Sequence, residues 1–181
     1  MRPFVVCAIS FLCSACVGHG QDAHEPGDRL GTYHVTGALT TDTCQASALL
    51  GETSQWAFDV KLSRDKSTLY WLNGEEAIPG TIAADGTGFG FQSGVEVPLA
   101  DAQGARPGCT ILRSDTADGV LSSSSTDVSS FSVNLSFGYA VESGSECSAF
   151  VGVQGGFASM PCRVSYSMTA ERTALPTAVD D

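Results

Sequence analysis

Apolar residues alternate with small or polar residues along much of this 181-residue chain, and this period of two is what most constrains its fold. The longest example runs from Phe131 to Val141, and shorter ones occupy residues 56–62 and 162–168. Successive side chains of a β-strand point to opposite faces of a sheet, so this pattern predicts strands with one buried face.

Turn signals separate further short strands, which we expect at 33–39, 68–72, 81–83, 89–91, 95–99 and 110–112. Asn73-Gly74 and Asp85-Gly86 are typical of tight reversals. Residues 43–50 are the one helical candidate. We therefore expect an all-β antiparallel meander of about eight to ten strands. So many strands hide their edges in a small closed barrel or in a sandwich, and the sequence leaves both open.

Residues 1–15 have the features of a secretory signal peptide, with Arg2, an apolar run and then small residues. The apolar run is shorter than the roughly 20 residues that a membrane-spanning helix needs. Ser14-Ala15-Cys16 resembles the lipobox of bacterial lipoproteins, in which the cysteine receives a diacylglyceryl group and becomes the first residue after cleavage. This resemblance implies lipidation at Cys16 and attachment to the bacterial cell envelope, with the outer membrane as the expected place.

Cleavage nearer Gly18 or Gly20 is the alternative, and it would give a soluble secreted or periplasmic protein. In either case residues 16–30 are expected to be a flexible tether, 31–172 a single β domain, and 173–181 a disordered tail. The layout is similar to that of small uncharacterised lipoproteins of myxobacteria. Gly31-Thr32-Tyr33 resembles the opening motif of lipocalin-like barrels, with tyrosine in place of tryptophan, which implies a small barrel.

Four cysteines remain after removal of the signal peptide and lipidation of Cys16: Cys44, Cys109, Cys147 and Cys162. An even number in an exported chain predicts two disulfides, with three connectivities open. We favour Cys147–Cys162, because the glycine-rich segment between them can fold back, and hence Cys44–Cys109. Their spacing is not that of a zinc site, so we expect no metal.

Charge and motifs argue against several classes of function. The formal net charge of −11 would repel a nucleic-acid backbone. No serine lies in a G-x-S-x-G motif, and the glycines near Gly88 lack the lysine and the following helix of a phosphate loop. Residues 115–119 lack the spacing of a calcium loop and are expected to form a surface turn. We therefore expect neither catalysis nor a cofactor.

Aromatic residues are the remaining indication of function. Trp56, Trp71 and Tyr33 are candidates for lining an apolar site, although the same residue types also fill solid cores. We expect a non-catalytic envelope lipoprotein, held at the membrane by its lipid anchor, whose β domain binds a small apolar ligand or another envelope protein. The alternative is a structural or surface lipoprotein with a filled core and no ligand.

Overall fold

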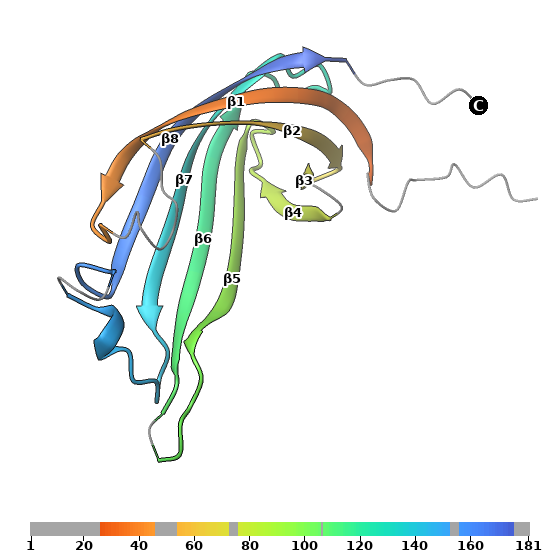
Figure 1. Ribbon diagram of the computed structural model, residues 1–181. Coiled ribbons are helices and arrows are strands. Elements are labelled where there is room, and N and C mark those ends of the chain that lie inside the picture. The colour runs from red at the N-terminus through yellow and green to blue at the C-terminus, as the bar shows by residue number, and fades with distance from the viewer. Residues whose placement is uncertain (1–25, 46–53, 73–75, 106, 153–155, 176–181) are drawn as a thin grey trace, which may run out of the picture.

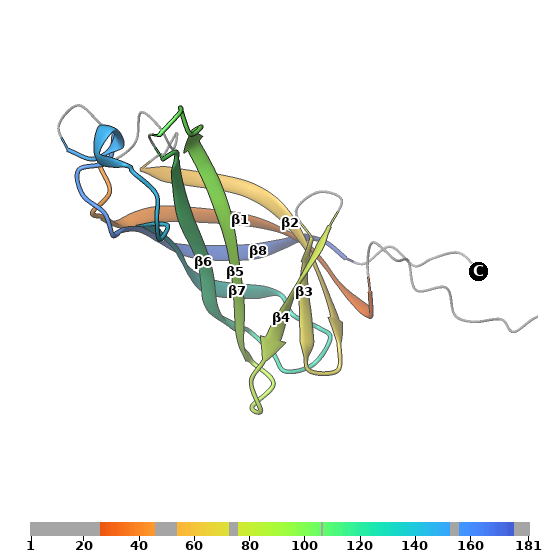
Figure 2. The same cartoon turned by 90° about the horizontal axis from the view of Figure 1, so that it is seen from below.

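The computed structural model describes residues 26–45, 54–72, 76–105, 107–152 and 156–175, which form a closed antiparallel β-barrel (Figures 1 and 2). Strands follow one another around the barrel in chain order, and the last pairs with the first. The expected meander is thus confirmed, and the barrel is the arrangement that forms. The strands are β1 (Asp28–Asp42), β2 (Gln55–Asp65), β3 (Thr68–Leu72), β4 (Ala77–Ile82), β5 (Gly88–Ala100), β6 (Cys109–Leu121), β7 (Ser130–Val141) and β8 (Cys162–Ala174), and the 3-10 turn η1 (Ser148–Phe150) precedes β8.

Several strands are longer than expected. Segments 89–91 and 95–99 belong to one strand, β5. Residues 115–119 are not a surface turn, because they lie within β6 and pair with β5 and β7 along their whole length. Their Asp- and Gly-rich composition disfavours a strand locally, and pairing on both sides overrides that preference.

The barrel strands also include residues that the sequence analysis places in the flexible tether and the disordered tail. Leu30, placed in the tether by sequence, is fully buried in β1. Thr173 and Ala174, placed in the tail, end β8, and Ala174 pairs with Thr32. Cys16, Asn73-Gly74 and residues 46–50 lie outside the described residues, and residues 43–45 are not helical.

The barrel interior is filled at both ends. The end where the chain enters, here the entry end, is packed with Tyr33, Leu62, Leu69, Phe89 and Phe131. The hydroxyl of Tyr33 donates to the backbone oxygen of Val128 at 2.7 Å, which draws the β6–β7 connection across this end. At the opposite end, here the disulfide end, Ile111, Tyr139, Phe157 and Val164 fill the interior.

Two disulfides link neighbouring segments at the disulfide end, and their connectivity differs from the one that the sequence favours. Cys44 pairs with Cys162, and Cys109 pairs with Cys147. Closure of the barrel sets β1 beside β8, so the end of β1 brings Cys44 to the start of β8. In the same way the chain after β7 returns to the start of β6. Strand neighbours decide the pairing, and the short loop between Cys147 and Cys162 does not.

Glycine permits close packing of two phenylalanines on the inner face. A Cβ at Gly119 would overlap the ring of Phe89, and a Cβ at Gly80 would lie 2.5 Å from the ring of Phe91. Each ring therefore lies over a glycine of the neighbouring strand.

Candidate functional site: a lateral aromatic cleft

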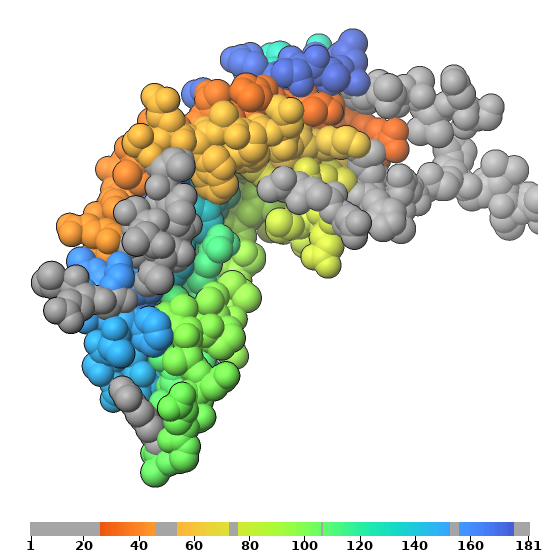
Figure 3. All heavy atoms as spheres, in the orientation of Figure 1, coloured from red at the N-terminus to blue at the C-terminus, as the bar shows by residue number. Residues whose placement is uncertain are grey.

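The barrel wall is complete only at the entry end. β3 pairs with the Lys61–Asp65 half of β2, and β4 pairs with β5 only at Phe89 and Gly90. The other halves, 55–60 of β2 and 91–100 of β5, pair with no strand on this side within the described residues. A lateral opening lies between them, and Figure 3 shows the surface hollowed between β4 and β5.

An aromatic cleft of about 250 Å³ lies at this opening. Its rings form a chain of contacts from Trp56 to Phe58 to Trp71 to Phe91, with neighbouring ring centroids 5.1, 6.0 and 5.8 Å apart. For comparison, a dry cavity of about 150 Å³ accepts benzene. The cleft therefore has room for a small apolar group. The further lining residues are Ile78, Gln92, Ser93, Arg113, Asp115, Thr116, Ala117, Leu135 and Phe137.

Large apolar side chains are exposed at the rim of the opening. Trp56 is 37% exposed, Ile78 42% and Val95 52%. All three occupy inner-face positions, because they pair with Gly37, Trp71 and Arg113 in the registers of their strands. Their exposure follows from the short pairing of β3 with β2 and of β4 with β5, which among the described residues leaves the rest of β2 and β5 without a neighbour on this side. Two of them, Trp56 and Ile78, also line the aromatic cleft, so exposed apolar surface and cleft coincide, as they do at binding sites.

One ion pair interrupts the apolar lining. Arg113 and Asp115 are two positions apart on β6 and both line the cleft. The Nε and Nη2 groups of Arg113 donate to the two carboxylate oxygens of Asp115 at 2.7 and 2.8 Å. The guanidinium also lies 4.6 Å from the ring centroid of Phe137. The cleft thus combines aromatic walls with a charged pair that can orient a ligand.

Two of the three aromatic candidates from sequence lie in the cleft. Trp56 and Trp71 line it, whereas Tyr33 is fully buried in the core at the entry end. Burial raises the pKa of Tyr33 to about 12, with Arg172 opposing and Asp127 adding to the shift.

Sequence reasoning did not identify Arg113 and Asp115 as site residues. The composition of residues 115–119 predicts a surface turn, whereas in the structure β6 continues through them and carries both Arg113 and Asp115. The signal was present, because Ile111, Arg113, Asp115 and Ala117 continue one period-two row. A charged pair inside such a row indicates a polar position on an otherwise apolar face.

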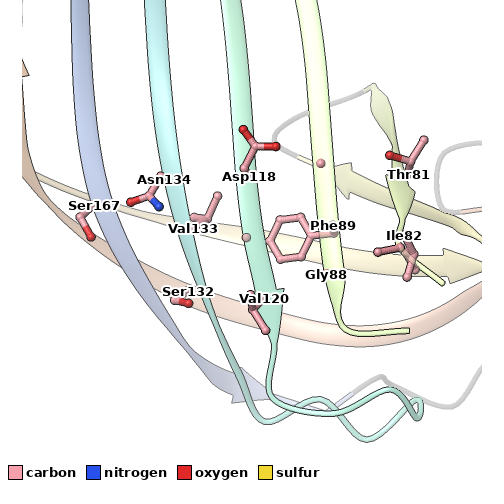
Figure 4. A pocket seen from close by; sticks show the side chains of 13 residues that line it. Thr81, Ile82, Gly88, Phe89, Asp118, Val120, Ser132, Val133, Asn134 and Ser167 are labelled. Carbon is pink, nitrogen blue, oxygen red and sulfur yellow. The ribbon is translucent and has the colours of Figure 1, made fainter. Parts of the chain in front are cut away.

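A larger concavity, of about 590 Å³, lies on the outer face of the barrel (Figure 4). Asp118 of β6, Asn134 of β7 and Ser167 of β8 are neighbours in register across it. The twist of the sheet and the short side chains on its outer face create this hollow. Its central side chains are exposed and polar. The aromatic cleft, which removes a ligand from water, is therefore the stronger candidate site.

In the described ranges, no three His, Cys, Asp or Glu side chains are placed to hold a metal ion together. His34 forms an exposed pair with Asp59, with 2.7 Å between Nδ1 and Oδ1. None of the helices in the part of the chain that the structure describes has the length and apolar character needed to cross a membrane.

Comparison of the chain with protein-family models, with curated proteins and with solved structures found no match to any of them.

Proposed function

We propose that this protein is a non-catalytic binding protein whose lateral cleft takes up a small apolar group. The observation that carries the proposal is an open barrel wall at which Trp56, Ile78 and Val95 remain exposed beside a chain of contacting rings. Covering these side chains would release apolar surface from water, which favours binding at about 25 cal/mol per Å². The Arg113–Asp115 pair would fix the orientation of a polar substituent.

The same proposal sets the barrel at the bacterial cell envelope, anchored by lipid on Cys16. Support comes from the two disulfides, because such bonds persist in oxidising compartments. Cys16 itself lies outside the described residues. Intact mass spectrometry of protein extracted from its own membrane is the test. A diacylglyceryl increment on a chain that begins at Cys16 supports the anchor, and an unmodified chain that begins beyond Cys16 contradicts it.

Intrinsic fluorescence gives a direct test of the cleft, because the chain has 2 tryptophans and both line it. The neutral apolar dye N-phenyl-1-naphthylamine should quench their emission by energy transfer and gain fluorescence as it binds. Trp56→Ala should weaken dye binding without unfolding the protein, since this side chain is at the rim. An unfolded Trp56→Ala protein would assign the ring to the core.

A matched pair of variants separates the cleft from the rest of the barrel. Ser93→Phe places a ring in the cleft, whereas Ser114→Phe adds the same ring to the outer face of β6. We expect Ser93→Phe to weaken dye binding by about tenfold or more and Ser114→Phe to leave it unchanged. Equal effects, or no saturable dye binding by the unmodified protein, would favour a structural protein without a ligand.

A further inference from the structure

The edge of β5 beside the cleft presents backbone groups in a regular array. The oxygen of Gly88 accepts from the N–H of Ala83, which directly follows β4, while the oxygen of Thr87 accepts from the N–H of Leu121 in β6. Successive residues of a strand direct their N–H and C=O groups to opposite sides. The register with β6 is regular from Gly88 to Pro98. Residues two, four and six positions beyond Gly90 therefore direct their N–H and C=O groups into the opening: Gln92, Gly94 and Glu96.

Pro98 supports this assignment, because the same alternation directs its backbone nitrogen into the opening. It pairs with Thr110 of β6 yet has no N–H to donate. Proline is tolerated in a strand when its nitrogen faces an edge, because no bond within the sheet is then lost. Pro98 also ends the array of donors, so the available edge is Gln92–Glu96, and its first residues, Gln92 and Ser93, line the cleft.

Deepening the proposed function, on which it rests, we infer that the ligand is an extended polypeptide segment that adds to β5 in line with β4. Only a peptide backbone offers donors and acceptors at the spacing of this edge. β3 and β4 fill the interval between β2 and β5 at the entry end (Figure 1). Beside them the surface is hollowed between β4 and β5 (Figure 3), and this hollow is where an added strand would lie. The cleft then receives a side chain of this segment.

The register specifies which side chain enters. A residue paired with Ser93 shares its face of the sheet, and Ser93 lines the cleft. That side chain would lie among Phe91, Trp71 and the Arg113–Asp115 pair. An apolar residue at this position, with polar residues on either side of it, matches an inner face that is apolar and an outer face that is polar.

The negative charge of this protein disfavours an acidic partner. The chain carries a formal net charge of −11, and Glu96 lies on the edge itself. Pairing of β5 with β5 of a second copy would bring like charges together, which is unfavourable. The occupant is therefore a neutral or basic segment of another protein.

The test uses the whole protein and the peptide acetyl-Lys-Thr-Val-Thr-Phe-Thr-Lys-amide. Hydrogen exchange followed by NMR should slow by about tenfold or more at the amides of Gln92, Gly94 and Glu96 when the peptide binds. The amide of Ser93 faces β6 and should change little. The control peptide carries N-methyl groups on every threonine, which removes the donors that face β5, and it should bind about tenfold more weakly or worse.

Two variants test the same edge from the side of the protein. Gly94→Pro removes an edge N–H and should weaken peptide binding by about tenfold or more. Gly94→Ala keeps the N–H, and its Cβ would lie 3.7 Å from the oxygen of Arg113, an ordinary contact, so it is the matched control. Both should keep dye binding, which shows that the cleft is intact.

Each result has a distinct meaning. Dye binding without amide protection by the peptide would overturn the inference and leave the proposed function standing. Equal binding of the N-methylated peptide would also overturn it, because side chains alone would then be recognised. Protection that rises with protein concentration in the absence of peptide would assign the edge to a second copy and overturn it too. Amide protection by the peptide without dye binding by the protein would support the edge and contradict the proposed cleft for small apolar groups.

Discussion

Ionisation of Tyr33 should destabilise the barrel at alkaline pH. Its side chain is fully buried and its hydroxyl donates to Val128, and burial raises its pKa to about 12. In the unfolded chain the pKa of tyrosine is about 10. The folded state therefore holds the proton more tightly, so the stabilisation is complete below pH 10 and is lost as the pH rises through 12. Two pKa units correspond to about 2.7 kcal/mol, of which about 2 kcal/mol is lost by pH 12.

Denaturant unfolding of the unmodified protein and of Tyr33→Phe between pH 9 and pH 12 measures this effect. At pH 9 the variant should be less stable by about 1–3 kcal/mol, because the carbonyl of Val128 loses its donor. The stability difference should then shrink by about 2 kcal/mol as the pH approaches 12. All other ionisable groups are common to the two proteins, so their contributions cancel in the stability difference. Parallel curves over the whole range would refute the burial of this hydroxyl, and with it the closed entry end.

The disulfides and the glycines give further predictions. Non-reducing peptide mapping should find Cys44 linked to Cys162, and loss of this bond, with its sequence separation of 118, should lower the free energy of unfolding by about 5 kcal/mol on the chain-entropy model. Fragments that join any other cysteine to Cys44 would contradict the barrel closure. Gly119→Ala should cost about 1–3 kcal/mol in thermal or denaturant unfolding, because its Cβ would overlap the ring of Phe89. Gly94→Ala should stay within about 0.5 kcal/mol, and equal losses at both sites would show that the ring does not pack on Gly119.

Period-two patterning together with turn signals predicts an antiparallel β-meander and most of its strands. It worked for β7 and β8 because each strand buries one face along most of its length. It could not choose between barrel and sandwich, because either arrangement buries one face of every strand. The barrel depends on pairing of β1 with β8, a contact between the ends of the domain.

Long-range pairing also explains the errors. The short loop between Cys147 and Cys162 favours a disulfide between them, but the pairing of neighbouring strands determines which cysteines meet. The turn predicted at Asp115 is wrong because local composition does not include the effect of β5 and β7, which pair with β6 on either side. The lateral opening arises from the shortness of β3 and β4 relative to β2 and β5, and strand length is poorly defined by periodicity.

Binding at the cleft is tested most directly by NMR of the protein labelled with nitrogen-15 and titrated with N-phenyl-1-naphthylamine. We expect saturable shifts of the indole N–H signals of Trp56 and Trp71 and of the amide signals of Phe91 and Phe137, which also line the cleft. Shifts confined to the outer face around Asn134, with the two indole signals unmoved, would contradict binding at the cleft.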